Sequence, residues 1–240
     1  MSAISEISKS RGMNSFGLGV LLARERLRGC GAPFVLLLSC AVVYALGVLE
    51  RRHNAFAAAD TVLTGAVFGF AIPVSSYLLS DRTCDGKKLG HSADVVARHG
   101  GDRRAVALGL LLTSALCMAL GSALLSTAAL LGAHAPGSSA FARDLRVSVA
   151  IALFSGEAYA LFFGAASLFG KRGGGRKWAL ALDFIFGAGS SFLALPWPRG
   201  HVRNLLGGSP VRDFSQTSAW LALAAIGVIS LTLSALRTPE

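Results

Sequence analysis

Two carboxylates lie inside apolar stretches of this sequence, where an ionisable group is costly. Glu157 lies near the middle of the apolar block 147–169, and Asp183 lies near the start of the block 178–197. Ionisable side chains at membrane depth mark polar pathways or buried pairs. Two interpretations of Glu157 stay open: a hydrogen-bonded packing group, or the lining of a polar path. Asp183 is close enough to the basic segment 171–177 to pair with it, which favours a structural role.

The other reactive side chains form no catalytic or metal-binding pattern. His91 and His99 are separated by about two helical turns, which is beyond the reach of one tetrahedral ion even with Cys84 and Asp85 upstream. The sequence therefore predicts no metal site. It contains no glycine-rich phosphate loop, no H-E-x-x-H and no G-x-S-x-G, so we expect neither ATP hydrolysis by this chain nor any other enzymatic activity. An intramembrane enzyme would have Glu157 as its one candidate group.

Six apolar blocks would have to position these residues, and each is about long enough to cross a bilayer. Hydrophobic residues make up 53% of the 240-residue chain and charged residues 15%, with a mean hydropathy of +0.57. This balance excludes an ordinary water-soluble domain. The sequence predicts an all-α, polytopic membrane protein with six transmembrane helices, near residues 31–49, 56–80, 105–133, 147–169, 178–197 and 217–236.

The distribution of basic residues predicts the orientation. Lys and Arg in alternate connections divide 16 to 7 in favour of the side that carries both termini. Cytoplasmic loops carry such an excess, so we expect a multi-pass protein of the bacterial inner membrane with both termini in the cytoplasm. The net charge of +10 comes from short clusters between apolar blocks. We therefore expect contacts with membrane lipids and no nucleic-acid partner.

The residues before the first block form a region of their own. Within 14–29, apolar residues recur at helical spacing at Phe16, Val20, Ala23 and Leu27. This pattern is typical of an amphipathic helix in the inner headgroup region, and a frayed leader is the alternative. We divide the chain into a cytoplasmic N-terminus, 1–30, with this interfacial helix, and a six-helix transmembrane domain, 31–240.

Small residues and a proline mark the second block. Gly65 and Gly69 form a G-x-x-x-G pair, which allows close helix packing in membranes but also occurs through ordinary composition. Pro73 removes one helical hydrogen bond, and we expect it to bend this helix.

The loop 82–104 carries its own helix signal. Ser92 can cap a helix, Asp94 favours the amino end, and Gly100-Gly101 ends the run. These residues predict a short cytoplasmic helix. The segment 196–216, on the other side, is too polar to span and too apolar for a free loop, which predicts a re-entrant connection before the last block.

This layout resembles the permease subunit of type-2 ABC exporters over nearly the whole chain. The resemblance rests on the leader, the six blocks, the proline-containing connection before the last block, and the loop that opens with Asp81-Arg82 and Asp85-Gly86. It implies a homodimer, or a heterodimer with a second permease. It also implies that a separate ATP-binding ABC subunit holds ATP and Mg, that the chain itself needs no cofactor, and that the loop after the second span docks on that subunit.

The resemblance assigns a coupling role to six residues of that loop: Ser92, Asp94, Val95, Val96, Arg98 and His99. A second contact with the ATPase would fall near Ser10–Phe16. Glu157 becomes a candidate for the translocation path. Within the family, the haem-exporter permease shows motifs similar to Asp81 to Gly86 and to Arg172-Gly173-Gly174.

The sequence leaves two functions open. The first is the permease of an ATP-driven exporter, coupled to its ATPase through 82–104. The alternative is a non-transporting membrane anchor or assembly factor that holds a cytoplasmic complex through the same loop. The transported substrate stays open in either case.

Overall fold

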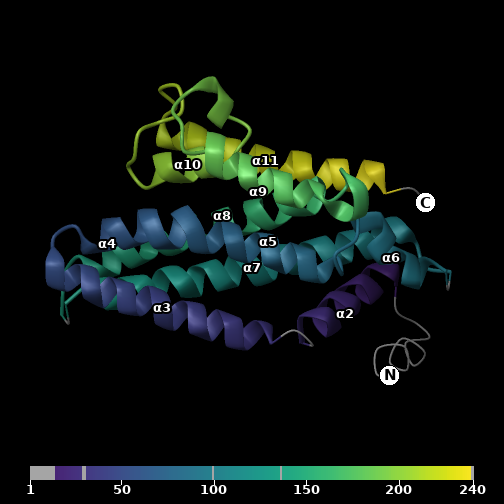
Figure 1. Ribbon diagram of the computed structural model, residues 1–240, viewed down its shortest axis with the longest axis horizontal. Helices are drawn as coiled ribbons and strands as arrows, with labels where there is room; N and C mark the ends of the chain where they lie inside the picture. The colour runs from purple at the N-terminus through teal and green to yellow at the C-terminus, as the bar shows by residue number, and fades with distance from the viewer. Residues whose placement is uncertain (1–13, 29–30, 99, 136, 239–240) are drawn as a thin grey trace.

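The computed structural model describes residues 14–28, 31–98, 100–135 and 137–238, and it is helical without strands over those ranges (Figure 1). The longer helices are α2 (Ser15–Arg28), α3 (Ala32–His53), α5 (Ile72–Thr83), α6 (Leu89–Ala97), α7 (Arg103–Ala133), α8 (Phe141–Ala166), α9 (Gly175–Phe186), α10 (Pro198–Leu205) and α11 (Gln216–Arg237). The shorter or irregular ones are α4 (Ala58–Thr61), the π-helix η1 (Val62–Ala71), and the 3-10 turns η2 (Lys171–Gly173) and η3 (Phe192–Ala194).

Five helices are long and apolar enough to cross a membrane, and they coincide with five of the six predicted blocks. They are Ala32–His53, Ala58–Thr83, Arg103–Ala133, Phe141–Ala166 and Gln216–Arg237, the second being a continuous rod of α4, η1 and α5. Each has a mean hydropathy of 1.6 or more in its most apolar window. The chain is thus an all-α, multi-pass membrane protein.

The block 178–197 differs from the prediction, because it does not form one spanning helix. Helix α9 has 12 residues, about 18 Å at 1.5 Å per residue, against a hydrocarbon core of about 30 Å. It ends at Phe186, where Gly187 and Gly189 and two serines follow, and such residues favour turns over helix. The backbone at Gly187 also lies against α10, since an added Cβ would be 2.8 Å from the Arg199 Cβ.

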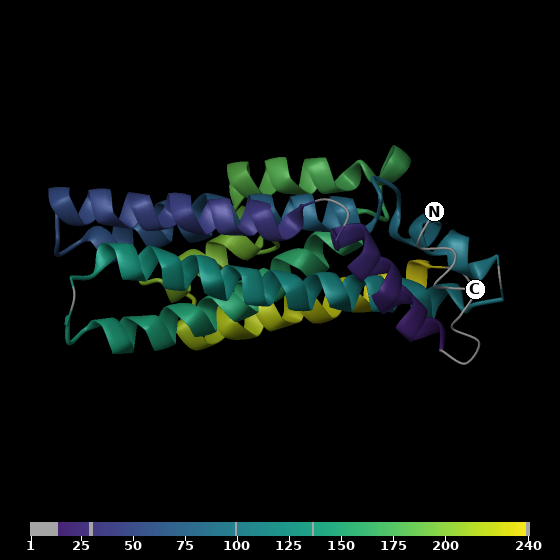
Figure 2. The same ribbon diagram turned by 90° about the horizontal axis from the view of Figure 1, so that it is seen from below.

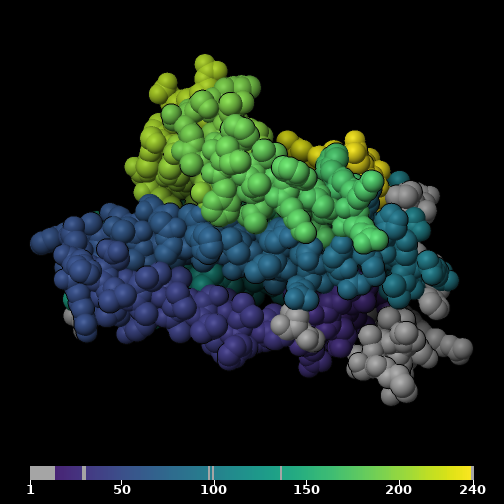
Figure 3. Space-filling view, viewed as in Figure 1, coloured from purple at the N-terminus to yellow at the C-terminus, as the bar shows by residue number. Residues whose placement is uncertain are grey.

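The helices lie in three layers (Figures 1 and 2). Helices α7 and α8 are central, α2 and α3 pack on one side of α7, and α11 packs on α8. We call the end of the bundle that carries α6 the α6 end, and the opposite end, with residues 54–57, 134–135 and 137–140, the far end. In Figure 3, α9 and α10 cover the rod of η1 and α5 and stand out from the bundle.

Glycines allow the closest helix contacts. A Cβ added at Gly132 of α7 would lie 2.2 Å from the Tyr44 carbonyl oxygen of α3, and one added at Gly47 would lie 2.6 Å from the Ala129 oxygen. Gly19 and Gly109 bring α2 onto α7 in the same way. The G-x-x-x-G pair is not part of such a contact within the described chain, because a Cβ at Gly65 would meet no atom within 4 Å.

We expect Gly132→Ala to lower the thermal unfolding midpoint of the purified protein, because α3 and α7 must move apart to accept the methyl group. Overpacking of this kind costs about 1–3 kcal/mol. Gly121→Ala on the same helix is the matched control: the nearest atom to its added Cβ is the Leu36 Cδ1 at 3.7 Å, an ordinary contact, and the change gains about 0.5–1 kcal/mol of helix propensity. Equal midpoints for the two variants in detergent would contradict the α3–α7 contact.

Candidate functional site

The predicted loop helix is present as α6, but it begins earlier than Ser92. Lys88 is the extended residue before the first turn, and the helix starts at Leu89. Ser92 lies inside the helix, fully buried, and its hydroxyl donates to the Cys84 carbonyl at 2.6 Å and to the Lys88 carbonyl at 3.0 Å. The prediction that Ser92 caps the helix is therefore wrong, because its hydroxyl instead ties the helix to the preceding turn.

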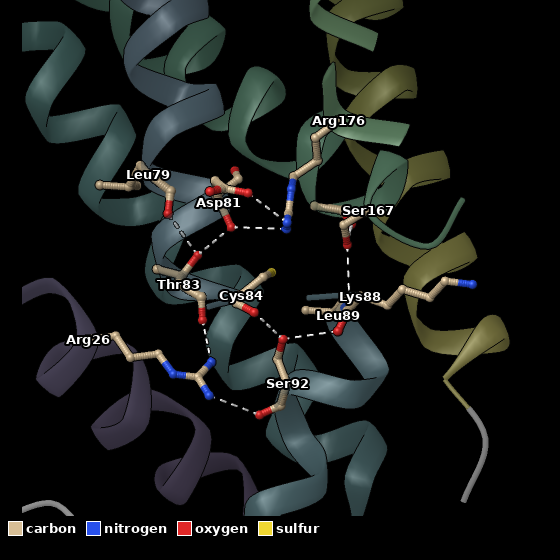
Figure 4. A network of polar contacts seen from close by, with 12 residues as sticks. Arg26, Leu79, Asp81, Thr83, Cys84, Lys88, Leu89, Ser92, Ser167 and Arg176 are labelled. Carbon is tan, nitrogen blue, oxygen red and sulfur yellow. Dashed lines mark hydrogen bonds and ion pairs between the residues drawn. The ribbon is translucent and has the colours of Figure 1, made fainter. Parts of the chain in front are cut away.

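A network of buried and part-buried polar contacts fixes α6 to three other helices (Figure 4). The Arg26 guanidinium of α2 donates to the Thr83 carbonyl at 2.5 Å and to the Ser92 carbonyl at 3.2 Å. The backbone N–H of Leu89 donates to the Ser167 hydroxyl at 3.2 Å, just after α8. Displacement of α6 would therefore act on α2, α5 and α8 together.

A buried arginine joins the start of α9 to the end of α5. Arg176 is 1% exposed, and its guanidinium lies 2.8 Å from the Asp81 carboxylate and 3.4 Å from the Ser80 carbonyl (Figure 4). Beside it, a Cβ at Gly173 would lie 2.7 Å from the Lys87 carbonyl oxygen. The two short motifs that carried the haem-exporter resemblance, 81–86 and 172–174, are thus neighbours in space.

In the sequence, Arg176 is one charge of the basic segment 171–177, and the pair with Asp81 was not predicted. A signal was available, because Arg176, Ala179 and Asp183 recur at helical spacing and form the buried face of α9. An arginine and an aspartate on the buried face of one short helix indicate partners on neighbouring helices.

The structure separates the predicted coupling residues into two groups. Ser92 and Val96 are buried, Val96 at 2% exposure, so they support α6 rather than contact a partner. Val95 is 45% exposed and Arg98 is exposed, while Asp94 pairs with Arg103 of α7 at 3.0 Å. His99 and most of Ser10–Phe16 lie outside the described residues. Val95 and Arg98 are the residues of this set that α6 presents outward.

Cys84 lies at the centre of the network and reports on its integrity. Its thiol is 3% exposed, between Arg26 on one side and Arg176 on the other (Figure 4). Burial raises the pKa of this thiol, and the two arginines offset only part of that effect. Since the thiolate is the reactive form, Cys84 is inert while the network is closed.

A second polar cluster holds α10 against the membrane-spanning helices. Asp183 is fully buried; it accepts from the Tyr159 hydroxyl at 3.0 Å and from the Arg199 backbone N–H at 3.2 Å. The Arg199 guanidinium lies 3.6 Å from the Asp183 carboxylate and 3.9 Å above the Phe184 ring. The predicted pairing of Asp183 with the loop 171–177 is wrong: its partner is Arg199, because α9 turns Asp183 toward α8 and α10.

The same arginine reaches the middle of the second span. Its guanidinium donates to the Gly69 carbonyl of η1. Pro73 has no N–H to offer to the carbonyl four residues earlier, which is that of Gly69. Pro73 thus leaves an acceptor for Arg199 at membrane depth, on a stretch that is a π-helix rather than a simple bend.

Glu157 does not belong to either cluster. Its side chain is exposed on α8, on the same stripe as Val147 and Phe154, which are 55% and 49% exposed. The interpretation of Glu157 as a hydrogen-bonded packing group of this chain is therefore wrong. A carboxylate on the outer surface of a spanning helix requires water or a polar partner.

No group of three or more His, Cys, Asp and Glu side chains suited to a metal ion is found among the described residues. Comparison with known proteins returned no matching family model, no matching curated protein and no matching solved structure.

Proposed function

We propose that the chain is the permease subunit of an ATP-driven exporter of the type-2 ABC class. One observation carries the proposal: α6 is a short helix outside the candidate spans, fixed by polar contacts to α2, α5 and the end of α8, with Val95 exposed. A separate subunit would bind ATP and Mg and push on α6. This displacement of α6 would reach the second candidate span, which ends with α5, and the fourth, which is α8, through the contacts of Arg26, Ser92 and Ser167.

The α6 end would lie in the cytoplasm of a bacterial cell, at the inner membrane, with both termini. The excess of basic residues supports the cytoplasmic side, and two contacts support the end of the bundle: Arg176 at the start of α9 meets Asp81, and Thr238 after α11 accepts from Arg104 at 3.0 Å. The fifth block thus leaves the α6 end and the last helix returns to it. The fifth crossing would consist of α9 and the segment between α9 and α10. That segment folds back and does not continue α9 as one helix.

The translocation path would run along the exposed face of α8. Glu157 lies on that face, where contact with lipid would be costly for a carboxylate. A second permease copy, identical or related, would enclose it in a polar interior. Gly65, with open space beside it, is a candidate contact for that second copy. The alternative function, a membrane anchor, would also use α6 to bind its partner, but it gives Glu157 no role.

The proposal is tested by Val95→Asp. We expect the tagged variant to lose an ATP-binding subunit that co-purifies with the unchanged chain from its native cells, because a charge replaces an exposed apolar contact. Val96→Asp is unsuitable, since Val96 is buried and its loss would unfold α6. The matched control is Phe56→Asp, which removes a fully exposed apolar side chain at the far end and is expected to keep the subunit.

Mass spectrometry of the complexes distinguishes the two functions. An ATPase with a phosphate-binding loop that Val95→Asp releases supports transport. A complex without such a subunit supports the anchor, and an ATPase retained at full yield by the variant overturns the role of α6.

A further inference from the structure

A pocket of about 230 Å³ opens at the α6 end beside the network, and Lys88 belongs to both. Its lining comes from the residue before α6 and the first two turns of α6, from the start of α7, from the segment after α8, and from the end of α11: Lys88, His91, Asp94, Arg103, Leu168 and Arg237. Gly90 forms part of the wall, and its neighbour Thr238 lies within 3.6 Å of an added Cβ. The end of α11 is thus fixed against α6, and the pocket has defined walls.

The pocket carries an excess of positive charge. Asp94 is the one acidic residue of the lining, and it is neutralised by Arg103 at 3.0 Å. Lys88 and Arg237 form no ion pair with any residue that the structure describes. The pocket is thus lined by two cations without a counter-charge among the described residues and by the ring of His91. This lining favours binding of an anion, and a phosphate group suits the donors of Lys and Arg.

The surroundings favour an anion that carries apolar chains. Leu168 lines the pocket, and Arg237 lies 4.9 Å above the ring of Phe169, which is 45% exposed. Along α11, Leu236 and Ile229 are 69% and 57% exposed on the outer face of a candidate span. The pocket therefore lies at the end of a candidate span, and exposed apolar side chains lie along the same helix.

We propose that this pocket binds the phosphate of an anionic phospholipid, with the acyl chains along the end of α11. The lipid would bridge α6 and α11, which contribute Lys88 and Arg237. This inference concerns a lipid site and does not depend on the transport function. A free phosphate ion shares the same chemistry, and the experiment separates the two sources.

The test uses the complete chain, purified in detergent, and native mass spectrometry with phosphatidylglycerol, phosphatidylcholine or inorganic phosphate added. We expect retained phosphatidylglycerol adducts and a higher unfolding midpoint with that lipid alone. The double variant Lys88→Gln/Arg237→Gln should bind phosphatidylglycerol at least about tenfold more weakly, since each basic residue near a surface contributes to anionic-lipid attraction. Its midpoint without lipid should be unchanged, which shows that it is folded.

Lys171→Gln/Arg172→Gln is the matched control, because it removes two exposed positive charges from the same end of the bundle. It should bind phosphatidylglycerol as the unchanged chain does. Equal loss in both double variants would show general surface attraction and overturn the site. Equal binding of phosphatidylcholine would overturn the need for an anionic headgroup, and stabilisation by inorganic phosphate alone would overturn the lipid as the occupant.

Discussion

Replacing Arg199 by methionine is expected to lower the thermal unfolding midpoint of the purified chain by about 10 °C. Asp183 is fully buried, and Arg199 supplies it with both a counter-charge and a backbone hydrogen bond. Removing one partner of a buried ion pair costs about 3–5 kcal/mol, because the other charge stays desolvated without compensation. The Gly69 carbonyl of η1 also loses its donor in this variant.

The fluorescence of Trp197 offers a local measurement of the same change, since it precedes α10 and packs edge to face on Phe162. Arg212→Met is the matched control, because Arg212 is exposed on the same connection. Its effect should stay within about 0.5 kcal/mol. A similar midpoint for both variants would show that the Asp183–Arg199 pair does not hold α10 in place.

Asp81→Asn is expected to raise the alkylation rate of Cys84 by at least about tenfold, since a hydrogen bond to a charged group contributes about 1.5–3 kcal/mol. The substitution leaves Arg176, 1% exposed, without its carboxylate partner, and the loop that carries α6 opens more often. Cys84 is buried beside Arg176, with a raised pKa, so it reacts mainly from the open state.

The measurement needs a background in which Cys30, Cys40 and Cys117 are alanine. Asp85→Asn is the matched control in the same loop: Asp85 is exposed and pairs with Lys87 on the surface, an interaction that contributes little. Equal rates in the two variants would contradict the anchoring role of the Asp81–Arg176 pair.

Length and hydropathy were sufficient to predict five spans, since a run of apolar residues long enough to cross a bilayer has few other stable structures. The break in the fifth block was harder to see. It too is a long and mostly apolar run. Helix α9 ends at Phe186 because glycines and serines follow and because Asp183 binds partners on α8 and α10. Such partners are not visible in a hydropathy pattern.

The sequence correctly predicted a helix within the loop 82–104, but it did not predict the residue at which the helix begins. Ser92 is a good capping residue by type, but its hydroxyl reaches the Cys84 carbonyl, which depends on how the loop folds back. The close glycine contacts show the same limit. Gly47 and Gly132 have no motif that marks them. Gly65 and Gly69 form a recognisable motif, but an added Cβ at Gly65 would meet no atom of the described chain and one at Gly69 would meet only Thr64 of the same rod.

If α6 transmits the work of a separate ATPase, a photo-crosslinking amino acid at position 95 should capture that ATPase in intact cells. We expect a crosslink to a subunit with the G-x-x-x-x-G-K-[ST] loop that this chain lacks, and no such product from position 56 at the far end. Adducts at position 95 only with lipid, or only with proteins that lack that loop, would contradict this role of α6.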